Sequence, residues 1–147
     1  MVLELIAIAV SILTLVLTGV ALWVTISQFK KQLELQIFAD YTKRYQEITL
    51  HFPEAVNQPQ FRISGLLSEQ RDRTLRYMRA YFDLCSEEYY LWKKGHIDAE
   101  TWREWETGIK FALSKAAFKE AWRILGLDTI YYGAFSQFVT ETMKSDT

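Results

Sequence analysis

The hydrophobic positions of this chain are concentrated near its N-terminal end. Residues 5–29 contain no charged side chain, and every Lys and Arg lies at Lys30 or beyond. A helix needs roughly 20 apolar residues to cross a hydrocarbon core of about 30 Å, so this run is long enough to span a membrane. Acidic Glu4 precedes the run and no small-residue cleavage site lies before the basic pair that follows it, which argues against a cleaved signal peptide. We therefore predict a transmembrane helix over residues 1–28.

The charges on either side of the predicted span indicate its orientation. Lys30 and Lys31 follow the span directly, whereas only Glu4 and the α-amino group precede it. Because the cytoplasmic flanks of membrane helices are enriched in Lys and Arg, residues 30–147 are predicted to lie in the cytoplasm. The expected location is a bacterial inner (plasma) membrane, crossed once with the N-terminus outside. A single cysteine, Cys85, fits the reducing cytosol.

Small and polar residues follow one another along the predicted span at alternating steps of four and three. The spacing continues beyond the membrane and avoids every charge in the region, so one helix is expected from about residue 2 to about residue 52. We call these 13 positions the polar stripe. It consists of Ala7, Ser11, Thr14, Thr18, Ala21, Thr25, Gln28, Gln32, Leu35, Ala39, Thr42, Gln46 and Thr49.

The polar stripe supports two interpretations. Small residues and hydroxyls let membrane helices approach closely, which favours a homo-oligomer and, around a wetted axis, a pore. Serine and threonine hydroxyls in membrane helices also donate to the carbonyl four residues earlier, and they then need no partner. The first interpretation predicts a non-enzymatic, self-associating protein whose cytosolic domain receives a signal and controls a membrane opening.

A second, apolar stripe begins where the span ends. Pro53 closes the segment that carries it, so a juxtamembrane helix is expected over residues 29–52. A helix with one apolar side packs that side on a globular domain, and this helix is therefore expected to belong to the soluble fold. The stripe consists of Phe29, Leu33, Ile37, Tyr41, Tyr45, Ile48 and Phe52.

Residues 53–147 are predicted to form a helical bundle after a loop over 53–67. Expected helix caps are Ser68, Asp98, Ser114 and Asp128, with Gly95 and Gly126 closing two of the helices. No stretch shows sustained period-two alternation, so the fold class is all-α, with the transmembrane helix continuing into the juxtamembrane helix and then into the cytosolic bundle. The inward positions are expected to be Leu75, Met78, Phe82, Cys85, Tyr89, Trp92, Trp102, Trp105, Ile109, Leu113, Phe118, Ala121, Trp122, Leu125, Tyr131, Phe135, Phe138 and Val139.

The composition excludes several classes of function. The chain has 17 basic and 18 acidic residues, so it is no polybasic nucleic-acid binder and nucleic acid is not an expected partner. One cysteine excludes an internal disulfide, and neither histidine has a glutamate three residues before it, so no metal site and no cofactor are predicted. Glu87 and Glu88, near Arg79 and Asp83, are interpreted as a solvated, ion-paired face.

Four arginines gather in the second expected cytosolic helix, at Arg71, Arg73, Arg76 and Arg79. A solvated face, or contact with an acidic protein partner, is the simplest interpretation of such a cluster. Binding of anionic lipid headgroups or of a phosphorylated ligand is the alternative. On this interpretation the protein is a monomeric membrane-anchored module that docks its partner through the arginines.

Arg44 and His51 are the only candidates for catalysis. Seven residues are almost two helical turns, so both side chains are expected on one face of a helix that runs to about residue 52. A histidine acting as general acid or base and a phosphate-holding arginine can cooperate on an RNA backbone. The R-x6-H spacing resembles the signature of HEPN-type ribonucleases, which are all-α domains acting as dimers, and that resemblance implies a third candidate function.

Several short blocks carry a wider resemblance. They are Tyr41–Tyr45, Glu87–Leu91, Gly95–Asp98, Trp102–Gly108 and Ala121-Trp122 followed by Phe135–Val139. These blocks resemble segments of small bacterial single-pass membrane-anchored helical proteins to which no activity is assigned. In layout, a long membrane helix leading into a HEPN-like bundle, the chain also resembles the pore-forming membrane accessory proteins of RNA-targeting CRISPR systems, which implies a role in antiviral defence.

Overall fold

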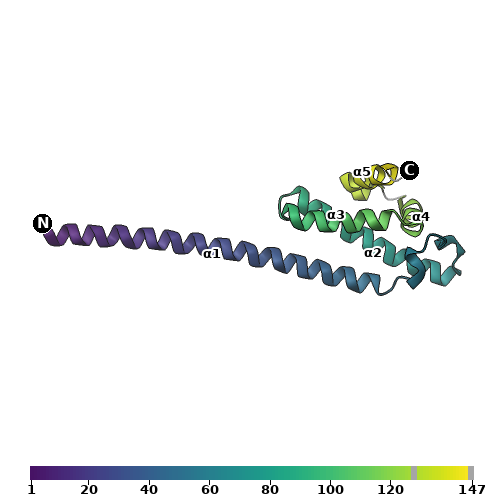
Figure 1. Ribbon diagram of the computed structural model, residues 1–147, viewed down its shortest axis with the longest axis horizontal. Coiled ribbons are helices and arrows are strands. Elements are labelled where there is room, and N and C mark those ends of the chain that lie inside the picture. Colours follow the sequence, from purple (N-terminus) through teal and green to yellow (C-terminus); the bar gives the residue numbers. More distant parts are fainter. Residues whose placement is uncertain (127–128, 146–147) are drawn as a thin grey trace. The chain divides into compact units, whose positions relative to one another are not determined.

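The computed structural model describes the backbone of residues 1–126 and 129–145, and side chains except those of 127–132 and 145–147. Every regular element in the described residues is a helix (Figure 1), so the all-α prediction is confirmed. The five α-helices are α1 (Val2–Thr49), α2 (Ser68–Lys93), α3 (Ala99–Leu113), α4 (Ala116–Leu125) and α5 (Thr129–Ser145); two 3₁₀ turns, η1 (Glu54–Asn57) and η2 (Ile63–Gly65), lie between α1 and α2.

The chain divides into two compact units, Met1–Ala39 and Asp40–Thr147. The first unit is helical from Val2 onward, and no residue of α1 is buried. Among the described residues, α1 is the helix long and apolar enough to cross a membrane. This composition is compatible with the predicted single-pass anchor. The boundary at Asp40 lies inside the predicted juxtamembrane helix.

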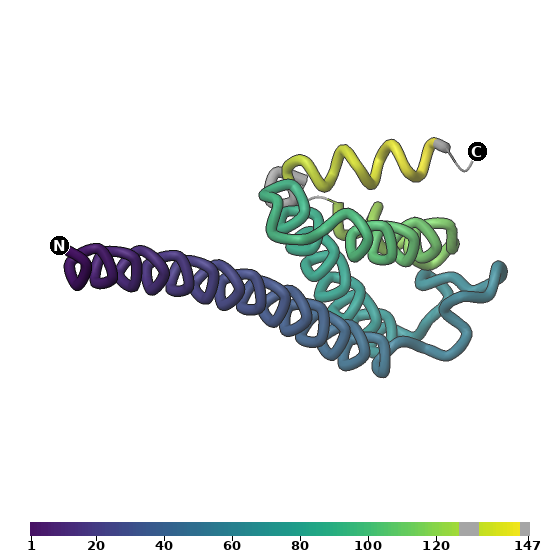
Figure 2. Tube along the Cα trace, turned by 60° about the vertical axis from the view of Figure 1, so that its left-hand side comes forward, coloured from purple at the N-terminus to yellow at the C-terminus, as the bar shows by residue number. Residues whose placement is uncertain are grey.

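The second unit is organised around α2, which packs against α3, α4 and α5 (Figures 1 and 2). Aromatic side chains fill the contacts: the Phe82 and Trp122 rings lie 5.0 Å apart between centroids, and Trp92 stacks on Trp102 at 4.6 Å. Edge-to-face and offset ring pairs of this kind add to the free energy gained by burial. The aromatic core predicted for the bundle is therefore confirmed.

The buried face of α2 is wider than the predicted seam. Met78, Phe82 and Cys85 are buried as expected, whereas Leu75, Tyr89 and Trp92 are only half-buried. Four residues outside the seam are buried as well, namely Thr74, Tyr81, Leu84 and Glu88. The predicted seam was too narrow because α2 contacts helices on more than one side. In α5, Phe135 and Val139 are buried as predicted, whereas the side chain of Tyr131 lies outside the described residues.

Three helix ends follow the sequence prediction closely. Asp98 caps α3, its carboxylate accepting from the backbone N–H groups of Glu100 and Thr101 at 2.8 and 3.0 Å. Gly95 follows α2 with φ at 72°, where residues other than glycine are strained. The N–H of His96 donates to the carbonyl of Leu91, which completes a Schellman motif. Gly126 closes α4 as predicted.

Two predicted caps are wrong, and a third cannot be compared. Ser68 is the first residue of α2, and no side chain caps that end of the helix. Ser114 ends α3, where its hydroxyl donates to the carbonyl of Phe111 at 2.7 Å, so it does not open α4. A serine hydroxyl can serve as a donor or as an acceptor, and sequence spacing does not distinguish the two roles. Asp128 lies outside the described residues.

The predicted loop over 53–67 is held to the bundle. Val56 and Ile63 are buried, and the Glu120 carboxylate of α4 accepts the backbone N–H groups of Ile63 and Ser64 at 2.8 and 3.0 Å. Partial burial alone raises the pKa of Glu120, but these bonds outweigh it and lower the pKa. Glu120 therefore stays ionised and acts as a fixed acceptor for the second 3₁₀ turn.

The last members of the apolar stripe pack inside the second unit. Phe29 and Leu33 belong to the first unit, so their contact with the soluble fold stays a prediction. From Tyr41 onward the aromatic members make contacts inside the second unit: Tyr41 stacks on Trp105, and Phe52 meets Phe118 edge-on. The helix also ends earlier than expected, at Thr49, before the chain reaches Pro53.

Candidate functional site

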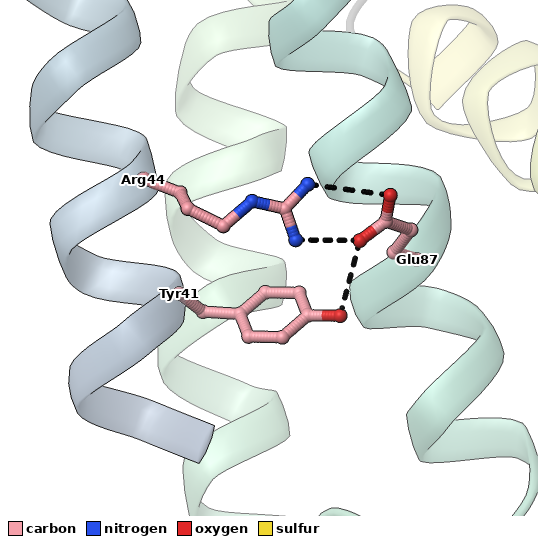
Figure 3. Close-up of polar contacts among 3 residues, drawn as sticks. All are labelled: Tyr41, Arg44 and Glu87. Carbon is pink, nitrogen blue, oxygen red and sulfur yellow. Dashed lines mark hydrogen bonds and ion pairs between the residues drawn. The ribbon is translucent and has the colours of Figure 1, made fainter. Parts of the chain in front are cut away.

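The last turns of α1 meet α2 through one polar cluster. Tyr41 and Arg44 are three residues apart on α1, so both side chains leave the same face of the helix and reach Glu87 on α2 (Figure 3). The Arg44 guanidinium forms a two-pronged pair with the Glu87 carboxylate, with N···O distances of 2.6 and 3.3 Å. The Tyr41 hydroxyl donates to the same carboxylate at 3.2 Å. We call these three residues the Arg44 cluster.

The charges in the Arg44 cluster reinforce one another. Hydrogen bonding from Arg44 holds the pKa of the Glu87 carboxyl below its usual range. The same bond raises the pKa of Arg44. Partial burial, with the negative charge of Glu87 beside it, raises the pKa of the Tyr41 phenol. At neutral pH the cluster therefore holds one carboxylate, one guanidinium and one neutral phenol.

Aromatic rings hold the Arg44 cluster in place. The ring of Tyr41 stacks on Trp105 of α3, with centroids 5.3 Å apart, and the guanidinium carbon of Arg44 lies 5.2 Å from the Tyr41 ring centroid. A shallow pocket of about 300 Å³ opens beside the cluster. Its lining combines phenol rings with carboxylates: Tyr41, Asp83, Ser86, Glu87, Tyr90 and Leu91.

Glu88, the next residue along α2, has a different environment from Glu87. Its residue exposure is 6%, whereas the side chain of Glu87 is 49% exposed. Burial, with Glu87 adding to it and Arg44 opposing it, raises the pKa of Glu88 to about 8. The prediction that Glu87 and Glu88 share a solvated face is therefore wrong for Glu88. Adjacent residues on a helix point about 100° apart, so one can face the interior while the other faces out.

The two catalytic candidates have different partners in the structure. Arg44 is held by Glu87, whereas His51 lies beyond the end of α1 and stacks on Tyr77, with ring centroids 4.1 Å apart. The expectation of a shared helical face required a helix that continued to about residue 52. Since α1 ends at Thr49, that part of the expectation is wrong, whereas a joint site of the two side chains stays a prediction. Ribonuclease activity stays a prediction of the spacing alone.

The hydroxyls of the polar stripe in the predicted span bond to their own helix. Ser11, Thr14, Thr18 and Thr25 each donate to the carbonyl four residues earlier, at 2.8 to 2.9 Å. Each of these four hydroxyl protons is therefore satisfied within its own helix. The small side chains also leave a shallow groove on the helix surface. It is lined by Val10, Ser11, Thr14, Leu15, Thr18, Gly19 and Leu22.

The residues of the polar stripe differ in exposure along α1. Between Ala7 and Ala39 its members are exposed, whereas Thr42 and Thr49 in the second unit are half-buried. A repeat of 3.5 residues also drifts by about 20° per heptad on a straight helix. Over six heptads the stripe turns by about 120° around α1, so a single shared face requires either a supercoil or a shorter contact.

Only part of the predicted partner-binding set, Arg71, Arg73, Arg76 and Arg79, is accessible for contact with an acidic partner. Arg71 lies 3.8 Å from Asp72, while Arg73 and Arg76 are exposed. The guanidinium of Arg62 donates to the carbonyls of Pro59 and Phe61, so it supports the loop and does not join the cluster. Arg73 and Arg76 are therefore the members best placed to meet an acidic partner.

The described residues contain no group of three or more His, Cys, Asp or Glu side chains that could hold a metal ion. Cys85 is buried, as expected for an inert thiol, and burial raises its pKa well above the usual value. Comparison of the chain with family models, with curated proteins and with solved structures gives no match.

Sequence reasoning missed the central contact of the site. Tyr41, Arg44 and Glu87 were all visible as residues, but the pairing joins positions 43 residues apart and depends on which faces of α1 and α2 meet. The local signal available was the three-residue spacing of Tyr41 and Arg44, which places an aromatic and a cationic side chain on one face. That signal does not name the partner.

Proposed function

We propose that this protein is a single-pass membrane protein that self-associates through its N-terminal helix and presents residues 40–147 as a cytoplasmic helical domain. The observation that carries the proposal is the groove over Val10–Leu22. It lies inside a run of 25 residues without a charge, on a helix with no buried residue. Membrane helices associate where small side chains let their backbones approach, because lipid supplies no hydrophobic driving force between helices.

The hydroxyls contribute to this association by their small size. Each already donates within its own helix, so no second helix is needed to satisfy its proton. The alternating spacing of four and three residues favours a left-handed crossing, as in other heptad-type contacts. Alanine at Thr14 and Thr18 is therefore expected to preserve association, whereas leucine there would fill the groove and prevent it.

The test is the oligomeric state of the full chain in lipid nanodiscs and in dilute detergent, measured by light scattering and by energy transfer between labelled copies. We expect an oligomer for the wild type and for Thr14→Ala/Thr18→Ala, and a monomer for Thr14→Leu/Thr18→Leu. Val16→Leu/Val20→Leu adds similar volume on the opposite side of α1 and is the matched control. A monomeric wild type, or equal effects of the two leucine pairs, would contradict the proposal.

The proposed orientation rests on Lys30 and Lys31, which follow the uncharged run. We expect the domain to resist protease added outside intact bacterial spheroplasts and to be digested once the membrane is permeabilised. Digestion in intact spheroplasts would reverse the orientation without affecting self-association.

A membrane opening is the further step of this proposal. The uncharged stripe favours it, because a ring of such helices places hydroxyl and amide groups around its axis. Release of a trapped dye from vesicles containing the purified protein is expected, with loss of release for Thr14→Leu/Thr18→Leu. If the wild type is an oligomer but the vesicles release no dye, the protein self-associates without opening the membrane.

A second candidate is an anchored module that docks an acidic or phosphorylated partner. The exposure of Arg73 and Arg76 favours it. Charge reversal, Arg73→Glu/Arg76→Glu, is expected to abolish partner recovery from solubilised membranes, while Lys43→Glu on α1 serves as a control for general charge. Unchanged recovery with the reversed arginines would remove this candidate.

A further inference from the structure

Two neighbouring acids on α2 are in opposite electrostatic situations. Glu87 is half-exposed and bonded to Arg44 and Tyr41, whereas Glu88 is buried. A carboxyl that is buried in this way is favoured as the neutral acid, because burial takes away most of the water that stabilises the anion.

The groups that act on Glu88 come from α1 and from α2. Two are charged: Arg44 on α1, which favours the anion, and Glu87 on α2, which opposes it. Three further groups stay protonated and uncharged near neutral pH, because burial raises their pKa values. They are Tyr45 on α1, and Tyr81 and Cys85 on α2. Tyr81 and Cys85 are 3% and 2% exposed, so both α2 groups are shielded from water together with Glu88.

The same residues form the contact between the last turns of α1 and α2. Arg44 and Tyr41 reach across to Glu87, and the rings of Tyr45 and Tyr81 lie 6.3 Å apart between centroids. If Glu88 ionises, a second carboxylate lies within the field of the same guanidinium. Arg44 then has two anions to neutralise, and one of them is buried unless the contact opens to water.

We propose that Glu88 makes the contact between the last turns of α1 and α2 depend on protonation: the neutral acid lets the contact close, and loss of the proton favours its opening. This inference does not rest on the proposed membrane function, since every residue in it belongs to the unit Asp40–Thr147.

The direction follows from the two pKa values of Glu88. In the closed contact its pKa is about 8, and in an open, hydrated contact it returns to about 4.3. Between those values the closed form binds one proton more than the open form. Closing is therefore most favourable below about pH 4.3, weakens as pH rises, and stops changing above about pH 8. The opening equilibrium constant should increase about tenfold per pH unit in the middle of this range.

The single cysteine of the chain is a natural reporter of opening. Cys85 lies three residues before Glu88 and is inaccessible when the contact is closed. The labelling rate of the full-length protein with a maleimide reagent would be measured from pH 5.5 to 9.5. Each rate is divided by the rate of the urea-unfolded protein at the same pH, which removes the intrinsic titration of the thiol. The normalised rate is expected to rise about tenfold per unit and level off near pH 8.

Three variants locate the effect. Glu88→Gln keeps the shape without the titration, so its normalised rate should be flat across the same range. Glu47→Gln, an exposed acid on α1 paired with Lys43, is the control and should follow the wild type. Glu87→Gln removes a negative neighbour of Glu88 and frees Arg44. The pH at which the normalised labelling rate levels off should therefore fall below 8. A flat wild-type curve, or the same rise in Glu88→Gln, would overturn the proposal.

Hydrogen exchange distinguishes opening of this contact from unfolding of the whole domain. Amides of residues 41–49 should lose protection with rising pH, while those of residues 109–113 in α3 keep theirs after correction for intrinsic exchange. Equal loss of protection in both segments would mean that the whole domain unfolds, and it would overturn the proposal of a local opening. If Glu88→Gln does not fold, the wild-type curves in the two segments still decide the question.

Discussion

Residues 1–39 and residues 40–147 differ in whether their apolar side chains are buried. In the first region no residue is buried, and Leu13 and Leu17 are 58% and 60% exposed. In the second, aromatic rings from several helices pack against one another. A contiguous exposed apolar surface is disfavoured in water, so the first region is compatible with a lipid environment, whereas the second region buries its apolar side chains in its own interior. One helix, α1, belongs to both regions.

The comparison also shows where side-chain polarity is satisfied. In the first region each stripe hydroxyl donates to its own helix, for example Thr18 to the carbonyl of Thr14. In the second region polar groups meet partners far away in sequence, as Arg44 meets Glu87. The stripe hydroxyls of the first region therefore need no partner outside α1, whereas Arg44 and Glu87 of the second region depend on a tertiary contact.

The largest expected effect comes from charging the first region. The double substitution Leu13→Arg/Leu17→Arg is expected to reduce membrane insertion by about 5–7 kcal/mol, since each central arginine costs about 2.5–3.5 kcal/mol. The protein should leave the membrane fraction on flotation. Leu50→Arg/Leu67→Arg changes two leucines that are also exposed, 81% and 74%, but lie in the second region. Retention of the first variant in the membrane, or release of the second, would contradict the expected difference between the two regions.

A smaller effect is expected when the interior of the second region is reduced. Phe82 is 1% exposed and contacts Trp122 edge-on, so Phe82→Ala should lower the free energy of unfolding by about 3–5 kcal/mol. Leu35→Ala, at a residue 70% exposed in the first region, should change it by less than about 0.5 kcal/mol. Thermal unfolding followed by near-ultraviolet circular dichroism compares the two. Equal shifts would mean that residue 35 is covered by another part of the protein.

The smallest expected effect concerns a helix end in the second region. Asp98→Ala removes the acceptor of two backbone N–H groups and of the Thr101 hydroxyl, and should cost about 1 kcal/mol. Ser68→Ala, at the other position that sequence spacing suggests as a cap, should have almost no effect. Urea unfolding of the two variants measures the difference. A comparable loss for Ser68→Ala would restore the serine as a cap.

Much of the fold followed from local pattern. The end of α2 at Gly95, the cap at Asp98 and the buried seam of α4 depend on residues within a few positions of one another, and each was predicted. The wrong caps, Ser68 and Ser114, failed because a hydroxyl has several local partners to choose from. The seam of α2 was predicted too narrow because apolar periodicity identifies one face of a helix without saying how many helices cover it.

By itself, the sequence determined the helical segments, the uncharged run of residues 5–29 and the aromatic composition of the core, because these depend on spacing and on side-chain chemistry along one segment. Only the tertiary structure decided that Arg44 pairs with Glu87, that Glu120 anchors the turn at Ile63 and that Glu88 is buried beside an exposed acid. These features depend on which helix faces meet. The free energy of such a meeting is a sum over long-range contacts, which no short window of sequence contains.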